Sequence, residues 1–232
     1  MGPMNKPPDA VFLDPQAVAS YDEGPRRNVP GYASLLPMTR ILLAEKMPAD
    51  GRELVEAAGG GVELADFAQA HPGWQMHGVD PSGPMLDLAT RRLGPSLSPR
   101  VTLQEGYVEA APDGPFDGAT CLLTFHFVPV SQRVPMAALL HRRLRPGAPF
   151  VAAHLSMDEE GDARELWLSR YAAFIEANGA QPEQVKMAKE KIQRDLPILT
   201  PAQDEAVLRD AGFREVQLFY VGFAFRGWVA YA

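Results

Sequence analysis

The sequence predicts an α/β fold with one mostly parallel, seven-stranded sheet. Between residues 52 and 155, five short apolar segments alternate with segments of helical periodicity. This alternation indicates βαβ units joined by right-handed crossovers. The last two apolar segments are joined too tightly for a helix, so they pair antiparallel and place one antiparallel strand at the end of the sheet. The expected strands are 52–57, 74–79, 101–105, 116–123, 149–155, 215–220 and 222–231.

Helical periodicity and strand spacing divide the chain into four parts. Residues 1–48 form an N-terminal tail and a helical lid, and residues 49–156 form a ligand-binding α/β core. Residues 157–198 form a helical insert after the fifth strand, and residues 199–232 supply a final helix and the two closing strands. Pro37 should kink its helix or set a new first turn. Residues 16–29 should form a short helix followed by a loop. The other expected helices are 32–47, 62–71, 83–94, 131–144, 160–178, 182–195 and 201–211.

The helical insert carries an apolar stripe. Trp167, Tyr171, Phe174 and Ile175 recur at helical spacing, which places them on one face of a helix. Such a stripe packs on the chain's own sheet, forms a dimer interface or roofs a pocket. The sequence leaves these three interpretations open.

Composition limits the classes of function. The chain has 232 residues, 46% of them hydrophobic, a net charge of −7 and one cysteine, Cys121. The acidic balance argues against an extended nucleic-acid surface, which needs clustered basic residues. The short basic run at 141–145 ends a helix, where cations complement the helix dipole. The sequence shows no apolar signal region, bilayer-spanning run or metal-ligand spacing, so we expect a cytoplasmic protein without a metal.

A glycine-rich turn follows the first strand. Within 53–64, an apolar strand leads into three glycines and then a helix start. Glycine lets a ligand approach the main chain, and the first N–H groups of a helix bind polar or anionic groups. Asp80 ends the next strand, where an acid accepts hydrogen bonds from ribose hydroxyls in nucleoside-binding folds. We therefore expect a nucleoside cofactor across two strand ends; the alternative is a strand–helix turn without a ligand.

The loop departs from a dinucleotide-binding motif, because Leu64 stands where the third glycine of G-x-G-x-x-G belongs. Ala57, Gly59 and Gly61 instead fit three small positions of a looser loop. Further motifs accompany it at Tyr21-Asp22, Val29-Pro30-Gly31-Tyr32, 79–86, 144–147, 171–179 and 208–213. On these residues the chain resembles the class I S-adenosylmethionine (SAM) methyltransferases over 50–156. Over almost its whole length it is similar to the branch that contains the carboxy-SAM synthase of the tRNA uridine-5-oxyacetic acid pathway.

The resemblance implies a Rossmann-like fold with SAM as cofactor, and it assigns residues to the cofactor site. Tyr32 matches a tyrosine that contacts the amino-acid end of the cofactor. Asp80 and Pro81 match the ribose and adenine positions. Tyr107 and Val108 stand where the synthase has residues beside the adenine. The residues that match the glycine loop are Ala57, Ala58 and Gly59.

Two departures from the synthase bear on the identity of the cofactor. Leu122 stands where the synthase has an asparagine near the reacting end. Lys191 stands where it has an arginine, given by a partner subunit to hold the extra carboxylate. Lysine is a point charge without the bidentate fork of arginine. We therefore expect ordinary SAM with a separate acceptor, and S-adenosylhomocysteine (SAH) as the product.

Methyl transfer from a sulfonium needs positioning, and it needs a base where the acceptor carries a proton. The acceptor should lie above the ends of the fourth and fifth strands. His126 lies just past the fourth strand and His154 ends the fifth. Both are candidate bases, since histidine titrates near neutrality. The alternative for each is a structural histidine, bonded to the backbone in the case of His126. Glu56 and Glu63 flank the glycine loop, and one of them is a candidate contact for the cofactor's ammonium group.

The sequence thus predicts a cytoplasmic SAM-dependent methyltransferase that acts on a small molecule and dimerises through the insert. The alternative within enzymes is a carboxy-SAM synthase, or a carboxy-SAM user, in tRNA wobble modification. A SAM- or SAH-binding protein without catalysis is the alternative outside enzymes, favoured by Ala57 and Leu122. An NAD-linked oxidoreductase is the fourth hypothesis.

Overall fold

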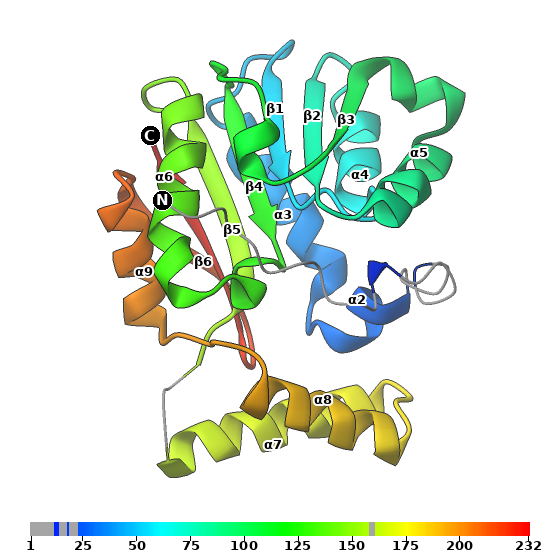
Figure 1. Cartoon of the computed structure of the whole chain (residues 1–232), viewed down its shortest axis with the longest axis vertical. Coiled ribbons are helices and arrows are strands. Elements are labelled where there is room, and N and C mark those ends of the chain that lie inside the picture. Colours follow the sequence, from blue (N-terminus) through cyan, green and yellow to red (C-terminus); the bar gives the residue numbers. More distant parts are fainter. Residues whose placement is uncertain (1–11, 14–17, 19–22, 158–160) are drawn as a thin grey trace.

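The computed structural model describes residues 12–13, 18, 23–157 and 161–232, which include one seven-stranded sheet with helices on both faces (Figure 1). The strands are β1 (Arg52–Glu56), β2 (Gln75–Asp80), β3 (Val101–Glu105), β4 (Gly118–Leu122), β5 (Pro149–Leu155), β6 (Arg214–Gly222) and β7 (Phe225–Tyr231). Their order is β3-β2-β1-β4-β5-β7-β6, and β7 is antiparallel to both of its neighbours. The predicted fold class, with its single antiparallel strand, is confirmed.

The helices cover both faces of this sheet and one of its edges (Figure 1). They are α2 (Glu23–Asn28), α3 (Tyr32–Ala44), α4 (Val62–Ala70), α5 (Gly83–Leu97), α6 (Val130–Arg143), α7 (Gly161–Ala177), α8 (Pro182–Arg194) and α9 (Pro201–Asp210). Leu54 and Val55 point to opposite faces of the sheet, because successive side chains of a strand alternate. The cluster around Val55 is completed by α3, α4 and α5, and the cluster around Leu54 by α6 and α9. The core therefore lies on both sides of β1.

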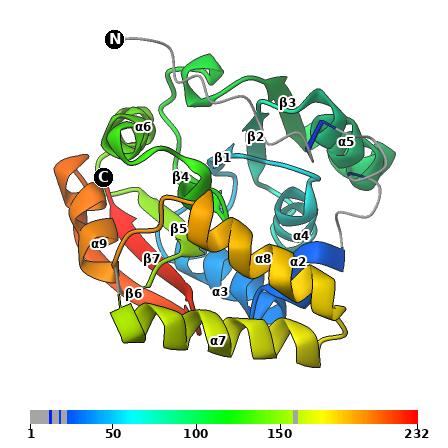
Figure 2. The ribbon, with the colours of Figure 1, turned by 60° about the horizontal axis from the view of Figure 1, so that its bottom comes forward.

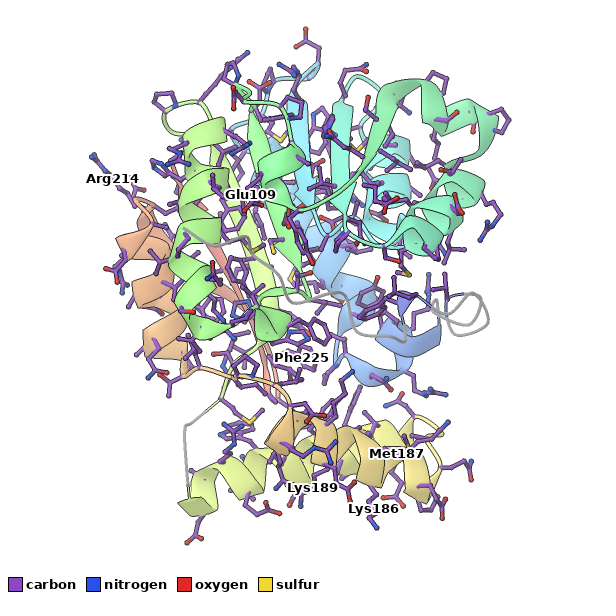
Figure 3. The ribbon with its side chains drawn as sticks, in the orientation of Figure 1. Glu109, Lys186, Met187, Lys189, Arg214 and Phe225 are labelled. Carbon is purple, nitrogen blue, oxygen red and sulfur yellow. The ribbon has the colours of Figure 1, made fainter. Side chains whose placement is uncertain are left out.

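The helical insert, α7 with α8, lies across the edge of the sheet at which β1, β2, β4 and β5 end (Figures 1 and 2). The ring of Tyr171 on α7 lies 5.9 Å from that of Phe225, and Phe174 lies 6.0 Å from Phe223. Figure 3 places Phe225 between the sheet and the insert. The apolar stripe therefore packs on the chain's own sheet, the first of its three interpretations. The dimer interface stays a prediction.

Some details of the elements differ from the predictions. Gly222 closes β6 instead of opening the last strand, because the hairpin turn lies after it, at Phe223, with a φ of +50°. α3 continues through Pro37, so the proline sets no new first turn. α5 continues beyond residue 94 around a non-helical Gly94. None of these differences changes the order of the strands.

The predicted N-terminal lid is described only in part. Within residues 16–29, predicted as a short helix followed by a loop, the described residues are 18 and those from 23 onward, and the Tyr21-Asp22 pair lies outside them. Figure 1 places α2 and the start of α3 beside the same edge of the sheet as the insert. Motion of this part as a lid stays a prediction.

Candidate cofactor site

The glycine loop between β1 and α4 packs against its surroundings at close range. Ala57, Gly59 and Gly61 have φ values of +58°, +48° and +74°. Glycine adopts this left-handed conformation freely, whereas alanine pays a steric cost for it. A Cβ on Gly61 would lie 2.8 Å from the Cβ of Ala89 on α5. A glycine is therefore needed at Gly61 both for the turn and for the close approach of α4 and α5.

Asp80, the last residue of β2, holds this loop with its carboxylate. Its Oδ2 accepts a hydrogen bond from the Gly59 amide at 2.9 Å, and its Oδ1 accepts one from the Ser82 amide at 2.8 Å. Burial raises the pKa of Asp80 to about 6, although both amide bonds oppose the rise. Each carboxylate oxygen has a second lone pair. Asp80 can therefore hold Gly59 and still accept a hydrogen bond from a ribose hydroxyl.

Glu56, the last residue of β1, is a second buried acid beside Asp80. Its side chain is 4% exposed, and its Oε2 has no hydrogen-bond partner among the described residues. Burial, followed by the charges of Asp80 and Glu109, raises the pKa of Glu56 well above 4.5, while Arg143 opposes the rise. A nearby positive charge favours the ionised form of such a group. The ends of β1 and β2 therefore suit a cationic ligand.

Glu63, the other acid beside the loop, belongs to a different cluster. Its carboxyl group lies beside the Thr120 hydroxyl, and burial raises its pKa to about 7. Thr120 also donates a 3.4 Å hydrogen bond to Glu53, whose pKa burial raises well above 4.5. Of the two acids that flank the loop, Glu56 is the one whose charge interacts with that of Asp80.

The residues predicted beside the adenine follow β2 and β3. Tyr107 follows β3, and it lies near Asp80 because the preceding Gly106 amide donates a 3.0 Å hydrogen bond to the Asp80 carbonyl. Burial, and then the charges of Asp80 and other acids, raises the pKa of Tyr107. Val108 begins a 3₁₀ turn and is fully buried in the core on the Leu54 face. Pro81 directly follows Asp80 and is half-buried. The structure therefore brings Tyr107 and Pro81 near Asp80, whereas Val108 is part of the core.

Two other predicted cofactor residues lie at element ends. Leu122 is the last residue of β4 and is 8% exposed. Tyr32 is the first residue of α3 and is half-buried against the core on the Val55 face. Ala58, in the loop itself, is buried beneath Gly78, where an added Cβ would lie 2.8 Å from the Cβ of Ala58.

The two candidate bases are both buried. His126 lies in the 3₁₀ turn Phe125–Phe127 after β4, and its Nδ1 accepts a 3.3 Å hydrogen bond from the Leu155 amide. Burial, then the charges of His154, Arg133 and Lys191, lowers the pKa of His126 well below 6.5. A neutral imidazole that accepts at Nδ1 carries its proton on Nε2. The geometry therefore matches the backbone-bonded alternative, and the catalytic role of His126 stays a prediction.

His154 lies beside a buried polar network that the sequence did not reveal. Its Nε2 lies 3.1 Å from Oδ1 of Asp204, the first-turn acid of α9. The same oxygen accepts a 3.2 Å hydrogen bond from Arg133, which is fully buried on α6. Arg133 also donates to the carbonyls of Val128 and Pro197. The network joins the loop after β4 to the chain that leaves the insert, and no sequence spacing signals a pair 71 residues apart.

Three segments of the chain come together around Phe127, at the edge of the sheet where β1, β2, β4 and β5 end. Its ring lies 5.9 Å from that of Phe12, edge to face, and 4.3 Å from that of His126. Lys191 on α8 places its Nζ 5.7 Å from the centroid of the same ring. Phe12 is tied in addition to the end of β2, because its carbonyl accepts a 2.5 Å hydrogen bond from Ser82. The N-terminal segment, the β4 loop and the insert therefore converge on one aromatic side chain.

Neither a metal centre nor a membrane span is found in the described part of the chain. Within it, no three His, Cys, Asp or Glu side chains are grouped so that they could hold a metal ion. No described helix is long and apolar enough to cross a membrane.

Sequence comparison relates the chain to SAM-dependent enzymes. Residues 54–147 match the family model of a methyltransferase domain. The chain is 28% identical over 226 residues to the carboxy-S-adenosyl-L-methionine synthase of Chromohalobacter salexigens, across 94% of this chain and 82% of that protein. It is 24% identical over 224 residues to the synthase of Aeromonas hydrophila, across 94% and 89%.

Solved structures share the fold at low identity. Human N-acetylserotonin methyltransferase in complex with SAM superposes with a TM-score of 0.64 at 12% identity, over 99% of this chain and 60% of that one. A SAM-dependent methyltransferase from Aquifex aeolicus superposes with a TM-score of 0.63 at 18% identity, over 94% and 98%. The family match, the strand order and the loop with its acid agree. Residues 54–147 therefore form a methyltransferase domain, and the chain has the Rossmann-like fold of the class I methyltransferases.

Proposed function

We propose that the chain is a SAM-dependent methyltransferase that acts on a small-molecule acceptor. The observation that supports this most strongly is the buried pair of acids, Asp80 and Glu56, at the ends of β2 and β1. SAM, when bound, supplies a methyl group on a positively charged sulfonium. It also carries an ammonium group and two ribose hydroxyls. Two buried carboxyl groups with raised pKa values therefore match both its charge and its hydrogen-bond donors.

Different residues of this chain bind different parts of SAM. Asp80 accepts hydrogen bonds from the ribose, and the unpartnered Oε2 of Glu56 receives the positive end of the ligand. The glycine loop lets the ligand approach the main chain. Tyr107, half-buried on the acidic side, covers the adenine.

A small acceptor fits the other half of the edge, beyond β4 and β5. The insert lies across this edge in Figures 1 and 2, and Lys191 brings a positive charge to within 5.7 Å of the Phe127 ring. A large acceptor would have to displace the insert. His126 and His154 stay the candidate bases of this proposal. His126 must give up its bond from Leu155 before its Nδ1 can take a proton from the acceptor.

Ligand binding tests the cofactor part of the proposal. We would identify the small molecules released from the purified protein by mass spectrometry, and then titrate SAM, SAH and NADH in a thermal-shift assay. A ligand at 100 times its Kd stabilises the fold by about 2.7 kcal/mol. We expect SAM and SAH to raise Tm, and Asp80→Ala to abolish the rise. Asp87→Ala, which removes an exposed acid from α5, is the matched control. A rise with NADH alone would contradict the proposal.

Turnover separates an enzyme from a binding protein without catalysis. The protein would be incubated with methyl-labelled SAM and pooled small-molecule acceptors, and labelled products would be separated by chromatography. Label transfer that is lost in Asp80→Ala and kept in Asp87→Ala supports a methyltransferase. Binding of SAM without transfer to any acceptor pool would favour the non-catalytic alternative.

A carboxy-SAM synthase is the second candidate, because relatives that match 94% of this chain carry that name. In this structure Lys191 reaches Phe127 of its own chain, so the cation does not have to come from a partner subunit. This candidate predicts that carboxy-SAM raises Tm more than SAM does, and that Lys191→Ala removes the difference. Lys186→Ala, on an exposed position of the same helix, is the control. Equal stabilisation by SAM and carboxy-SAM would count against the synthase.

A further inference from the structure

Tyr220 on β6 holds the turn that leads into α3, although the two lie 190 residues apart in sequence. Its hydroxyl donates a hydrogen bond to the carbonyl of Pro30, and its side chain is 6% exposed. Burial raises the pKa of Tyr220 to about 12. The hydroxyl therefore keeps its proton at neutral pH and remains a hydrogen-bond donor.

The turn held by Tyr220 ends on a predicted cofactor residue. The Tyr32 amide donates a 3.1 Å hydrogen bond to the Val29 carbonyl, which closes a four-residue turn. Pro30 stands at its second position, and Gly31, with a φ of +75°, stands at its third. This is the pattern of a type II turn, in which glycine supplies the left-handed third position. The position of Tyr32 at the start of α3 therefore depends on how the Pro30-Gly31 peptide is held.

The absence of a side chain at Gly222 allows the close contact between the turn and β6. A Cβ on Gly222 would lie 2.7 Å from both the Pro30 oxygen and the Tyr220 hydroxyl. A Cβ on Gly31 would make an ordinary 3.5 Å contact with the Tyr220 ring, so at this position the left-handed φ is what favours glycine. Real Cβ atoms do not approach backbone oxygens at 2.7 Å, so any larger residue at Gly222 would push the turn away from β6. The hydrogen bond from Tyr220, the left-handed Gly31 and the absence of a side chain at Gly222 therefore all help to keep the turn against β6.

We propose that Tyr220 is a positioning residue for the cofactor site. It fixes the Pro30 carbonyl and, through the turn, the place of Tyr32, which the family resemblance puts at the amino-acid end of SAM. The closing hairpin of the sheet thereby takes part in cofactor binding without touching the cofactor. This inference rests on the proposed function, because it requires the chain to bind SAM or SAH.

The test is the affinity for SAH, measured by isothermal titration calorimetry on the full chain. Tyr220→Phe keeps the ring and removes one neutral hydrogen bond, so we expect a threefold to tenfold rise in Kd (roughly the 0.5–1.5 kcal/mol of one such bond). Val221→Ala changes the next residue, which is 58% exposed, and should bind as the wild type does. In a Tyr32→Ala background, Tyr220→Phe should cause no additional loss, because its effect passes through Tyr32.

Each result separates the positioning role from its alternatives. If Tyr220→Phe lowers Tm without ligand but leaves the SAH affinity unchanged, the residue is only structural and the inference is overturned. Equal losses in the presence and absence of Tyr32 overturn it as well. Gly222→Ala places a methyl group against both the Pro30 oxygen and the Tyr220 hydroxyl, so it should weaken SAH binding as Tyr220→Phe does. Unchanged SAH binding in this variant would again overturn the inference. If the wild type binds neither SAM nor SAH, the proposed function fails, and the inference fails with it.

Discussion

The Asp80 carboxylate accepts a 2.9 Å hydrogen bond from the Gly59 amide, so the end of β2 is tied directly to the loop after β1. The same carboxylate is the candidate acceptor for the ribose hydroxyls. One side chain therefore shapes the loop and contacts the ligand. Because burial raises its pKa to about 6, its ionisation changes close to physiological pH. The affinity for the cofactor should depend on pH for this reason.

We predict that SAH binding weakens below pH 6. The ligand hydroxyls donate to the ionised form of Asp80, and protonation removes one of its acceptor positions. Linkage then gives a loss of affinity of about tenfold per pH unit below the folded pKa, and a plateau above pH 7. Calorimetric titrations between pH 5 and 8 would measure it. Asp80→Asn should bind weakly and lack the step near pH 6. A wild-type affinity that stays constant from pH 5 to 8 would show that Asp80 does not ionise at the ligand.

We predict a second pH effect, caused by Glu63, on the stability of the protein without ligand. Its pKa is about 7 in the folded state and 4.5 as the ordinary value, so the folded state binds more protons between these limits. The contribution of Glu63 to the stability of the fold is therefore complete below pH 4.5, and it is lost as the pH rises from there through 7. The difference of about 2.5 pH units corresponds to roughly 3 kcal/mol at most.

Urea unfolding at pH 5.5 and pH 8 would measure this difference. We expect the wild type to be less stable at pH 8, and Glu63→Gln to be more stable than the wild type there. Glu45→Gln, which changes an exposed carboxylate at the end of α3, should leave the pH dependence intact. The attribution to Glu63 would be wrong if Glu63→Gln kept the full loss of stability between the two pH values.

The sequence was sufficient for the sheet because its signals are local. Alternating strand and helix patterns predicted all seven strands, and the short link between the last two predicted their antiparallel pairing. The hairpin end was misplaced because Gly222 is the turn-forming residue between Val216 and Phe225, whereas the turn itself lies one residue later. Its turn uses Phe223 at a φ of +50°, a conformation that phenylalanine rarely adopts and that its sequence does not announce.

The candidate site was predictable only where it follows strand ends. Asp80 and the glycine loop were found because spacing along βαβ units places them at one edge of the sheet. The bond from Gly59, the unpartnered oxygen of Glu56 and the contact of Lys191 with Phe127 depend on side-chain packing between elements. No periodicity records such contacts.

The pair of Arg133 and Asp204 supports a third prediction, about stability. Both side chains are buried, and Arg133 lies 3.2 Å from Asp204. Removing one member leaves the other charge buried and uncompensated, so we expect Asp204→Asn to cost about 3–5 kcal/mol. Arg209→Gln breaks an exposed pair with Glu205 on the same helix and should cost at most about 0.5 kcal/mol.

Urea unfolding of the single and double variants would test the pair. Replacing both charges, in Arg133→Met with Asp204→Leu, should recover part of the loss, because no buried charge then lacks a partner. If the losses of the two single variants simply add in the double variant, the two residues do not act as a pair.

The last prediction concerns the packing of the glycine loop. Gly61 and Gly147 have nearly the same φ, +74° and +78°. An added Cβ meets Ala89 at 2.8 Å in the first case and nothing within 4 Å in the second. Gly147→Ala should therefore lower the free energy of unfolding only by the strain of the left-handed backbone, about 1 kcal/mol. Gly61→Ala should lower it by roughly 1–3 kcal/mol more.

Because Gly61 opens α4, the displacement in Gly61→Ala should also reach the cofactor loop. We expect this variant to lose SAH affinity, whereas Gly147→Ala keeps it, and chemical unfolding with calorimetry would measure both effects. A further substitution distinguishes packing from backbone strain. Ala89→Gly removes the Cβ that the new methyl group meets, so it should restore part of the stability of Gly61→Ala. If it restored none, the cost at Gly61 would come from the turn alone, and the contact between α4 and α5 would not explain the glycine.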